Sequence, residues 1–128
     1  MAARSIAIVG ASPDPGRPSH SVMSYLLEQG YECVPVTPRA EEILGQVTYP
    51  SLEAAVAASG HGFDIVDVFR RAEHTPAIAR SAVALGCGTL WLQQGVVSTE
   101  AARIARAGGM SVVMDRCTAI EHWRGRPR

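Results

Sequence analysis

The chain has 128 residues, 47% of them hydrophobic, and its 12 basic side chains are matched by 12 acidic ones. This length is typical of one domain, so residues 1–128 are expected to fold as a single unit. A neutral total argues against nucleic-acid binding, which normally shows a basic excess, and no window has the ~18 apolar residues of a membrane span.

Short apolar runs alternate with segments of helical periodicity along the chain. The expected strands are Ile6–Gly10, Cys33–Val36, Ile65–Phe69, Thr89–Gln93 and Ser111–Met114. The expected helices are Ser21–Gln29, Ser51–Ala58, Thr75–Leu85 and Ser98–Ala107. Between residues 39 and 49 the pattern is weakest, and Glu41–Leu44 is compatible with one helical turn before Gly45. Strands that are apolar on both faces and alternate with helices predict an α/β fold with a doubly wound, parallel sheet.

A loop rich in Gly, Pro and Ser follows the first expected strand and leads into a helix. In an open α/β sheet, ligands bind beyond the carboxyl ends of the strands, where this loop usually lies. Its free N–H groups and the helix start attract phosphate, and Arg17, Ser19 and Ser21 add a guanidinium and two hydroxyls. After Gly10 the next glycine is Gly16, so neither the dinucleotide fingerprint nor a P-loop is present. Spacing alone leaves phosphate binding and a plain connecting loop both open.

The second strand ends in Thr37, Pro38 and Arg39. A domain that binds NAD places an acidic residue near this point to hold the ribose diol. Here Arg39 attracts a ribose phosphate instead, which favours NADP or coenzyme A (CoA), and Pro38 offers an apolar surface to an adenine. A solvated loop charge is the alternative interpretation of Arg39.

Several strings of residues, in order along the chain, resemble one protein family. They include Gly10-Ala11-Ser12, Arg17-Pro18-Ser19, Val36-Thr37-Pro38-Arg39, Asp64–Arg71, Trp91–Val96 and Met114-Asp115-Arg116-Cys117. Over residues 5–122 the chain resembles the small single-domain CoA-binding proteins, which share the fold of the CoA-binding domain of succinyl-CoA synthetase α subunits. The resemblance implies a Rossmann-like, mostly parallel five-stranded sheet with helices on both faces, and CoA or an acyl-CoA as the ligand.

The same resemblance implies which residues hold the cofactor. The pyrophosphate would lie against the first loop and the helix start, which comprise Gly10, Ala11, Ser12, Arg17, Ser19, His20, Ser21 and Val22. The adenosine end with its 3′-phosphate would meet Thr37, Pro38 and Arg39, and the adenine would also meet Phe69 and Arg70. Gln93 falls where the pantetheine arm is directed in the synthetase subunit.

No residues show the nucleophile, base and orienting partner of a hydrolase or transferase. Asp67, inside a strand, is expected to bond backbone amides or to pair with Arg70 or Arg116 rather than to catalyse. Cys117 follows Arg116, which favours a reactive thiol, although a small buried side chain is the commoner role. We therefore expect a sensor, carrier or regulatory module that binds CoA without catalysis and without a metal. An NADP-linked oxidoreductase or redox-sensing nucleotide-binding domain is the alternative.

The compartment and the partners are predicted only in outline. The residues before the first strand do not read as a signal peptide. The three cysteines are odd in number and lack metal-ligand spacing, so free thiols in the cytoplasm are expected. A protein partner or a homo-oligomer remains open.

Overall fold

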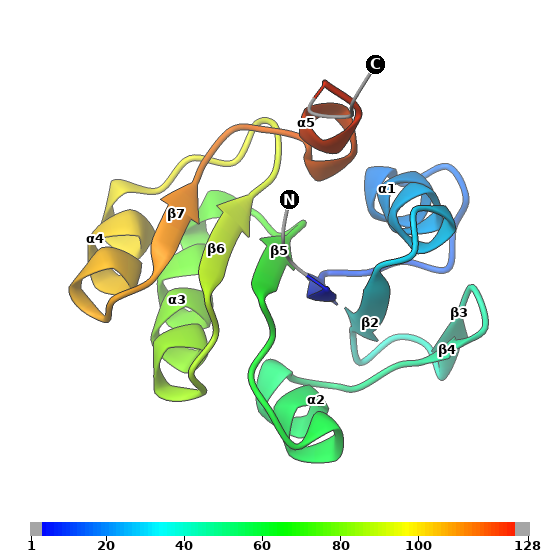
Figure 1. The fold of residues 1–128 in the computed structure, drawn as a ribbon, viewed down its shortest axis with the longest axis horizontal. Coiled ribbons are helices and arrows are strands. Elements are labelled where there is room, and N and C mark those ends of the chain that lie inside the picture. The colour runs from blue at the N-terminus through cyan, green and yellow to red at the C-terminus, as the bar shows by residue number, and fades with distance from the viewer. Residues whose placement is uncertain (1–3, 125–128) are drawn as a thin grey trace.

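Figure 1 shows the computed structural model of the chain, in which residues 4–124 are described. Five parallel strands form one sheet in the order β2-β1-β5-β6-β7. The strands are β1 (Ser5–Val9), β2 (Glu32–Val36), β5 (Ile65–Val68), β6 (Thr89–Leu92) and β7 (Ser111–Val113). Because β1 lies between β2 and β5, the strand order reverses beside β1, and a doubly wound sheet binds ligands at such a point.

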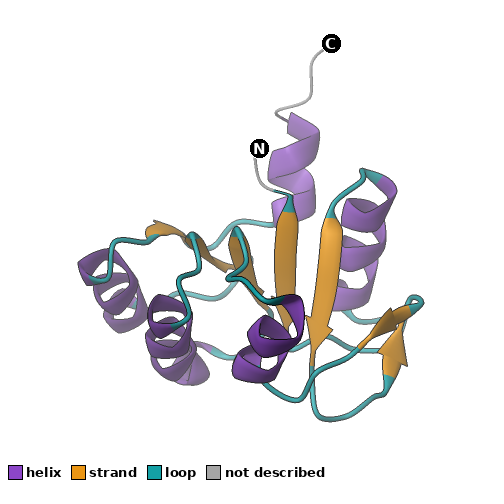
Figure 2. Cartoon of the chain, turned by 60° about the horizontal axis from the view of Figure 1, so that its bottom comes forward, coloured by secondary structure: helices purple, strands orange, loops and turns teal. Residues whose placement is uncertain are grey.

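Helices cover both faces of the sheet (Figure 2). One face packs against α1 (Pro18–Glu28) and α5 (Thr118–Arg124), and we call it the α1 face. The other packs against α2 (Leu52–Ser59), α3 (Thr75–Ala84) and α4 (Thr99–Ala107), and we call it the α3 face. The short 3₁₀ helix η1 (Ala72–His74) leads into α3. The predicted α/β, Rossmann-like fold with five parallel strands is confirmed.

Alternation along the strands builds the two cores. On β1, Ile6 and Ile8 point to the α1 face, whereas Ala7 and Val9 point to the α3 face. The α3 face is closed by alanines of two helices, namely Ala79, Ala82, Ala101 and Ala105, all buried. Such small side chains let the helices approach the sheet and each other closely, so that Leu90 and Leu92 of β6 are fully buried between them.

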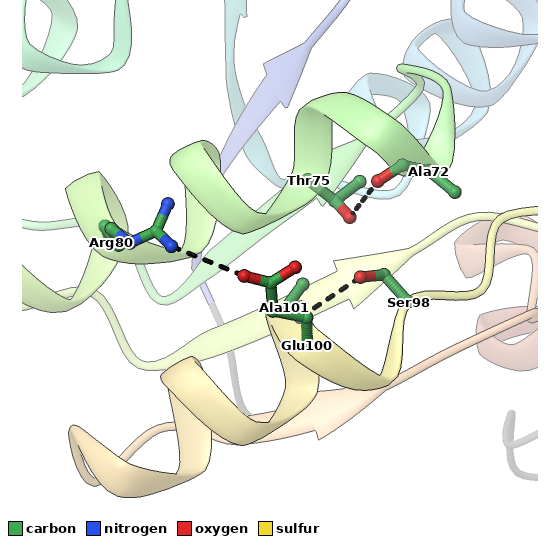
Figure 3. A network of polar contacts seen from close by, with 6 residues as sticks. All are labelled: Ala72, Thr75, Arg80, Ser98, Glu100 and Ala101. Atoms are coloured by element: carbon green, nitrogen blue, oxygen red, sulfur yellow. Dashed lines mark hydrogen bonds and ion pairs between the residues drawn. The ribbon is translucent and has the colours of Figure 1, made fainter.

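Local hydrogen bonds explain where the helices on the α3 face begin (Figure 3). The Ser98 hydroxyl oxygen accepts a hydrogen bond from the Ala101 amide at 3.1 Å and caps α4. Ser51 caps α2 in the same way. The Thr75 hydroxyl donates to the Ala72 carbonyl oxygen at 2.6 Å, which joins η1 to α3.

The structure differs from the sequence-based prediction in two segments. Around Gly45 the chain forms an antiparallel hairpin of β3 (Glu42–Ile43) and β4 (Gln46–Val47), not a helical turn. Its two turn residues, Leu44 and Gly45, have φ values of 51° and 78°, as a tight hairpin turn requires. The second difference is α5, which we did not predict; the Tyr25 hydroxyl and His122 Nδ1 lie 2.8 Å apart and join it to α1. No helix within the described residues has the length and apolarity needed to cross a membrane.

Candidate functional site

An open cavity of about 1190 Å³ lies over the carboxyl ends of β1, β2, β5 and β6. It therefore sits where the strand order reverses, as expected for a doubly wound sheet. Most of the residues predicted from the sequence to bind a cofactor line it: Gly10, Ala11, Ser12, Arg17, Ser19, Val22, Thr37, Pro38, Arg39, Phe69, Arg70 and Gln93. His20 and Ser21 do not line the cavity; the exposed Ser21 hydroxyl instead donates to the Pro18 carbonyl oxygen at 3.2 Å.

Hydrogen bonds at Gly10 and at its neighbour Val9 link the end of β1 to the ends of β2 and β5 beneath the cavity. The Gly10 amide donates to the Val36 carbonyl oxygen at 3.0 Å, and the Phe69 amide donates to the Val9 carbonyl oxygen at 2.8 Å. Gly10 has a φ of 86°, and a Cβ atom there would lie 2.9 Å from both the Phe69 carbonyl oxygen and Arg70 Cδ. Only glycine fits this left-handed conformation and close approach without strain.

The loop from Ala11 to Ser19 is held by its own polar groups. Asp14 Oδ1 accepts from the Gly16 amide at 2.9 Å, and the Ser12 hydroxyl oxygen accepts from the Asp14 amide at 3.1 Å. No side chain caps α1, which starts with proline after Arg17. Within residues 4–124, no hydrogen bond is made by the amides of Ala11, Ser12 and Ser19. Serine side chains cap α2 and α4, whereas the loop before α1 and the first turn of α1 keep free amide donors that can bind an anion.

The charge lining the cavity is positive. Four arginines line it, namely Arg17, Arg39, Arg70 and Arg71, and its lining contains no aspartate or glutamate. Arg71 forms an exposed ion pair with Glu73 at 3.7 Å. Among the described residues, no carboxylate forms an ion pair with Arg17, Arg39 or Arg70. Three guanidinium groups are thus available to a negatively charged ligand.

The end of β2 is fixed by a segment far along the chain. The Thr37 amide donates to the Tyr49 carbonyl oxygen at 2.8 Å, and the Tyr49 amide donates to the Pro35 carbonyl oxygen at 3.1 Å. The Thr37 hydroxyl oxygen accepts from the Arg39 amide at 3.2 Å, which turns the chain after Thr37. This pairing also brings Pro50 into the cavity lining, a position that sequence reasoning missed because Tyr49 lies outside any regular strand.

At the opposite end of the cavity, Gln93 follows β6 and contacts a buried carboxyl group. Asp67 in β5 is completely buried, and its Oδ1 accepts from Gln93 Nε2 at 2.5 Å. Its Oδ2 accepts from the Thr118 hydroxyl at 2.8 Å. Desolvation by burial raises the pKa of Asp67 to about 7, and the two side-chain hydrogen bonds oppose this rise. The predicted pairing of Asp67 with backbone amides, Arg70 or Arg116 was therefore wrong.

The segment after β7 folds over the end of β6 and brings Cys117 into the cavity lining. Asp115, at a φ of 57°, accepts from the Gly95 amide at 2.7 Å through Oδ1. The Trp91 indole N–H donates to the Arg116 carbonyl oxygen at 2.8 Å. Cys117 is half-buried, whereas Cys33 and Cys87 are buried and lie away from the cavity.

Sequence reasoning assigned no role to several further lining residues, among them Arg71, His74, Ile78 and Val96. Arg71 directly follows Arg70 at the end of the third predicted strand, so its position was a usable signal. His74 and Ile78 belong to η1 and α3, and only the three-dimensional packing brings them to the cavity. In the part of the chain that the structure describes, no three His, Cys, Asp or Glu side chains group as a metal site would require.

Comparison with known proteins identifies the family. The model of the CoA binding domain family matches residues 4–123. The chain belongs to this family of CoA-binding domains. The family predicted from the sequence is therefore confirmed, and residues 4–123 include every residue that we predicted to bind a cofactor.

Relatives of similar size share both sequence and fold. An uncharacterised Bacillus subtilis (strain 168) protein, YneT, is 38% identical over 117 residues, which are 91% of this chain and 84% of YneT. Cell-free ID.343 from Thermus thermophilus, a solved structure, is 39% identical in sequence to this chain. The match covers 95% of this chain and 90% of the Thermus chain, with a TM-score of 0.86. The structure of a hypothetical protein from Pyrococcus horikoshii OT3 is also similar, with 37% sequence identity and a TM-score of 0.88. This match covers 96% of this chain and 84% of the Pyrococcus chain.

Proposed function

We propose that this chain binds CoA or an acyl-CoA in the cavity over the carboxyl ends of its strands. One observation carries the proposal: the cavity combines free backbone donors with arginines that have no acidic partner among the described residues. CoA carries a diphosphate and a separate 3′-phosphate at one end of the molecule and a neutral pantetheine arm at the other. A cavity with several separated cations at one end matches that distribution of charge.

The positions of the cations suggest how the ligand lies. The diphosphate would meet the amides of Ala11, Ser12 and Ser19, with Arg17 beside them. The adenosine and its 3′-phosphate would lie toward the end of β2, against Pro38 and Arg39. The neutral arm would cross β5 toward β6, which is three strand spacings, or about 14 Å, from β2.

The same site supports a binding module more than an enzyme. Its polar lining consists of arginines, glutamines, the hydroxyl residues Ser12, Ser19 and Thr37, Cys117 and His74. No hydrogen bond joins His74 to one of these hydroxyls or to the thiol, so the lining does not hold a base beside a nucleophile. We therefore propose a single CoA-binding domain that senses, stores or presents the cofactor. Free thiols at Cys33, Cys87 and Cys117 fit a reducing compartment, so we assign the domain to the cytoplasm.

Titration calorimetry with CoA, dephospho-CoA and NADPH tests the proposal. We expect the wild-type protein to prefer CoA over dephospho-CoA, and Arg39→Ala to lose most of that preference by weakening CoA binding about tenfold. Arg80→Ala is the matched control, because Arg80 is an exposed arginine of α3 outside the cavity lining. Absence of CoA binding would refute the function, and equal affinity for CoA and dephospho-CoA would refute the role of Arg39. Tighter binding of NADPH would support the oxidoreductase alternative.

A further inference from the structure

Three side chains on the α1 face form a closed set of hydrogen bonds beneath the cavity. Gln93 Nε2 lies 2.5 Å from Asp67 Oδ1 and 2.9 Å from Thr118 Oγ1, and Thr118 Oγ1 lies 2.8 Å from Asp67 Oδ2. All three residues are at most 5% exposed. When Asp67 is ionised, its carboxylate only accepts, so Thr118 must donate its single hydroxyl proton to Asp67 and accept from Gln93.

This pattern of protons fixes the orientation of the Gln93 carboxamide. Both protons of Nε2 are used, one on Asp67 and one on Thr118. Rotating the amide by half a turn would set Oε1 against Asp67 Oδ1, and two acceptors would then face each other without a proton. The carboxylate of Asp67 therefore selects one of the two orientations that a free glutamine side chain adopts.

The remaining polar atom of Gln93, Oε1, is not fully enclosed by the protein. Within residues 4–124, no hydrogen bond reaches Oε1, yet no buried side-chain nitrogen or oxygen there lacks a partner. Oε1 is thus in contact with solvent, and Gln93 lines the cavity. The site presents a hydrogen-bond acceptor at this point, and that acceptor is held by two groups that do not themselves line the cavity.

The chemistry of this end of the cavity indicates what meets the acceptor. The arginines lie at the ends of β2 and β5 and in the loop after β1, whereas the lining beyond β6 consists of Gln93, Gln94, Gly95, Val96 and Cys117, all uncharged side chains. A ligand with its anions on the arginines places its neutral part here. In CoA that part contains two secondary amides, whose N–H groups are hydrogen-bond donors.

We propose that Asp67 and Thr118 are positioning residues that hold the Gln93 carbonyl oxygen toward the cavity, where it accepts a hydrogen bond from an amide N–H of the pantetheine arm. This inference rests on the proposed function, because it assigns one arm of CoA to one end of the cavity. It explains why a carboxyl group lies buried beside the apolar strand residues of the α1 face, where two hydrogen bonds offset only part of its desolvation. It also predicts selectivity, since a ligand group that only accepts hydrogen bonds would be disfavoured there.

Two ligands separate this role from a merely structural one. Adenosine 3′,5′-bisphosphate keeps the 3′-phosphate and one 5′-phosphate of CoA but lacks the second 5′-phosphate and the pantetheine arm. The ratio of its Kd to that of CoA therefore measures what these two parts contribute together, and a substitution that acts only on the arm changes the ratio. Calorimetry at about pH 8 keeps Asp67 ionised in the wild type. We expect Thr118→Val and Asp67→Asn each to lower this ratio roughly three- to tenfold, the effect of one neutral hydrogen bond. The Kd of the bisphosphate should stay unchanged, and Thr118→Ser, which keeps the hydroxyl, should retain the wild-type ratio.

Ser5→Ala is the matched control. Ser5 is a buried hydroxyl residue that hydrogen-bonds Asp64. It lies at the amino end of β1, whereas the cavity lies at the carboxyl ends of the strands. It should lower stability without changing the ratio. An unchanged ratio in Thr118→Val and Asp67→Asn, or equal weakening of both ligands, would overturn the positioning role while leaving CoA binding intact. If the wild type binds neither ligand, both the proposed function and this role fail.

An NMR measurement on the wild-type protein tests the same inference if the substituted proteins do not fold. In the wild-type protein, the side-chain amide signals of Gln93 in an NMR spectrum should be protected from exchange, since both protons are bonded. These signals should shift on addition of CoA but not of adenosine 3′,5′-bisphosphate. Rapid exchange, or an equal shift with both ligands, would contradict the inference.

Discussion

The two faces of the sheet are built from the same five strands but differ in what they bury. On the α3 face the strands present Ala7, Val66, Val68, Leu90 and Leu92, and the layer against the helices is apolar. On the α1 face, Ile6, Ile8, Ile65 and Trp91 surround a buried carboxyl group, Asp67. In β5 the alternation of side chains places Asp67 one residue from Val66 and Val68, on the opposite side of the strand.

This difference separates stability from binding within one domain. The apolar layer of the α3 face contributes free energy of folding by burial, and between about pH 5 and about pH 8 this contribution does not change with pH. On the α1 face, the desolvation of the Asp67 carboxyl group is unfavourable, and hydrogen bonds from Gln93 and Thr118 offset part of this free energy. Because Gln93 also lines the cavity, the face that buries the carboxyl group, the α1 face, is the one connected to the candidate ligand site.

The largest effect is expected on the α3 face. Leu90 is fully buried between β6 and the helices, and Leu90→Ala should destabilise the fold by about 2–5 kcal/mol through lost burial and a cavity. Chemical unfolding at about pH 5 and at about pH 8 measures it. The loss should be the same at both pH values, because within residues 4–124 the one buried acidic or basic residue, Asp67, lies on the other face. A loss that changes with pH would break the proposed contrast between the faces.

An intermediate effect, dependent on pH, is expected from Asp67 on the α1 face. Its pKa is raised from 3.8 to about 7 by desolvation, so between these values the folded state binds a proton that the unfolded state has released. The contribution of Asp67 is therefore fully present below about pH 4 and is lost as pH rises through about 7. The charge of Asp67 also acts on Cys33, whose thiol pKa is raised to about 12, mainly by burial, so that this thiol stays neutral across the same pH range.

Asp67→Asn isolates this contribution. The free energy of unfolding of the wild type minus that of Asp67→Asn should fall by about 1–4 kcal/mol between pH ~4 and ~8. Urea unfolding across this range gives the difference directly, and groups that titrate in both proteins cancel. A difference that is flat or rises with pH would mean that Asp67 is ionised throughout, and the cost assigned to the α1 face would be wrong.

Local sequence patterns predicted the sheet well because its strands are short, apolar and bounded by Gly, Pro or Asp. All five predicted strands match the observed ones to within one residue at each end. Helix α1 begins at Pro18 rather than Ser21, because proline fits the first turn of a helix, where its missing N–H is not needed. The hairpin at Leu44 was not predicted, since leucine at a positive φ contradicts its usual preference.

The site was predictable where its residues follow strand ends and not where distant segments meet. The loop after Gly10 and the end of β2 were found from their positions beside strands, whereas Gln93 was found from the family resemblance. The bonding partners of Asp67 were not, because Thr118 lies 51 residues away in a helix that local patterns did not reveal. The predicted strands are mostly apolar on both of their faces, so the sequence did not indicate that the polar cluster of Asp67, Gln93 and Thr118 would lie on the α1 face.

The smallest effect is expected at the outer surface of the α3 face. Arg80 and Glu100 form an ion pair of 3.5 Å between α3 and α4, with their side chains 61% and 56% exposed (Figure 3). Water and salt screen such a pair, so Arg80→Ala should change the free energy of unfolding by less than about 1 kcal/mol. A thermal melt compared with the wild type at low and high salt measures it. A larger loss would show that the pair, and not the apolar layer beneath it, holds α4 against α3, and would remove the simple account of this face as stabilised by burial.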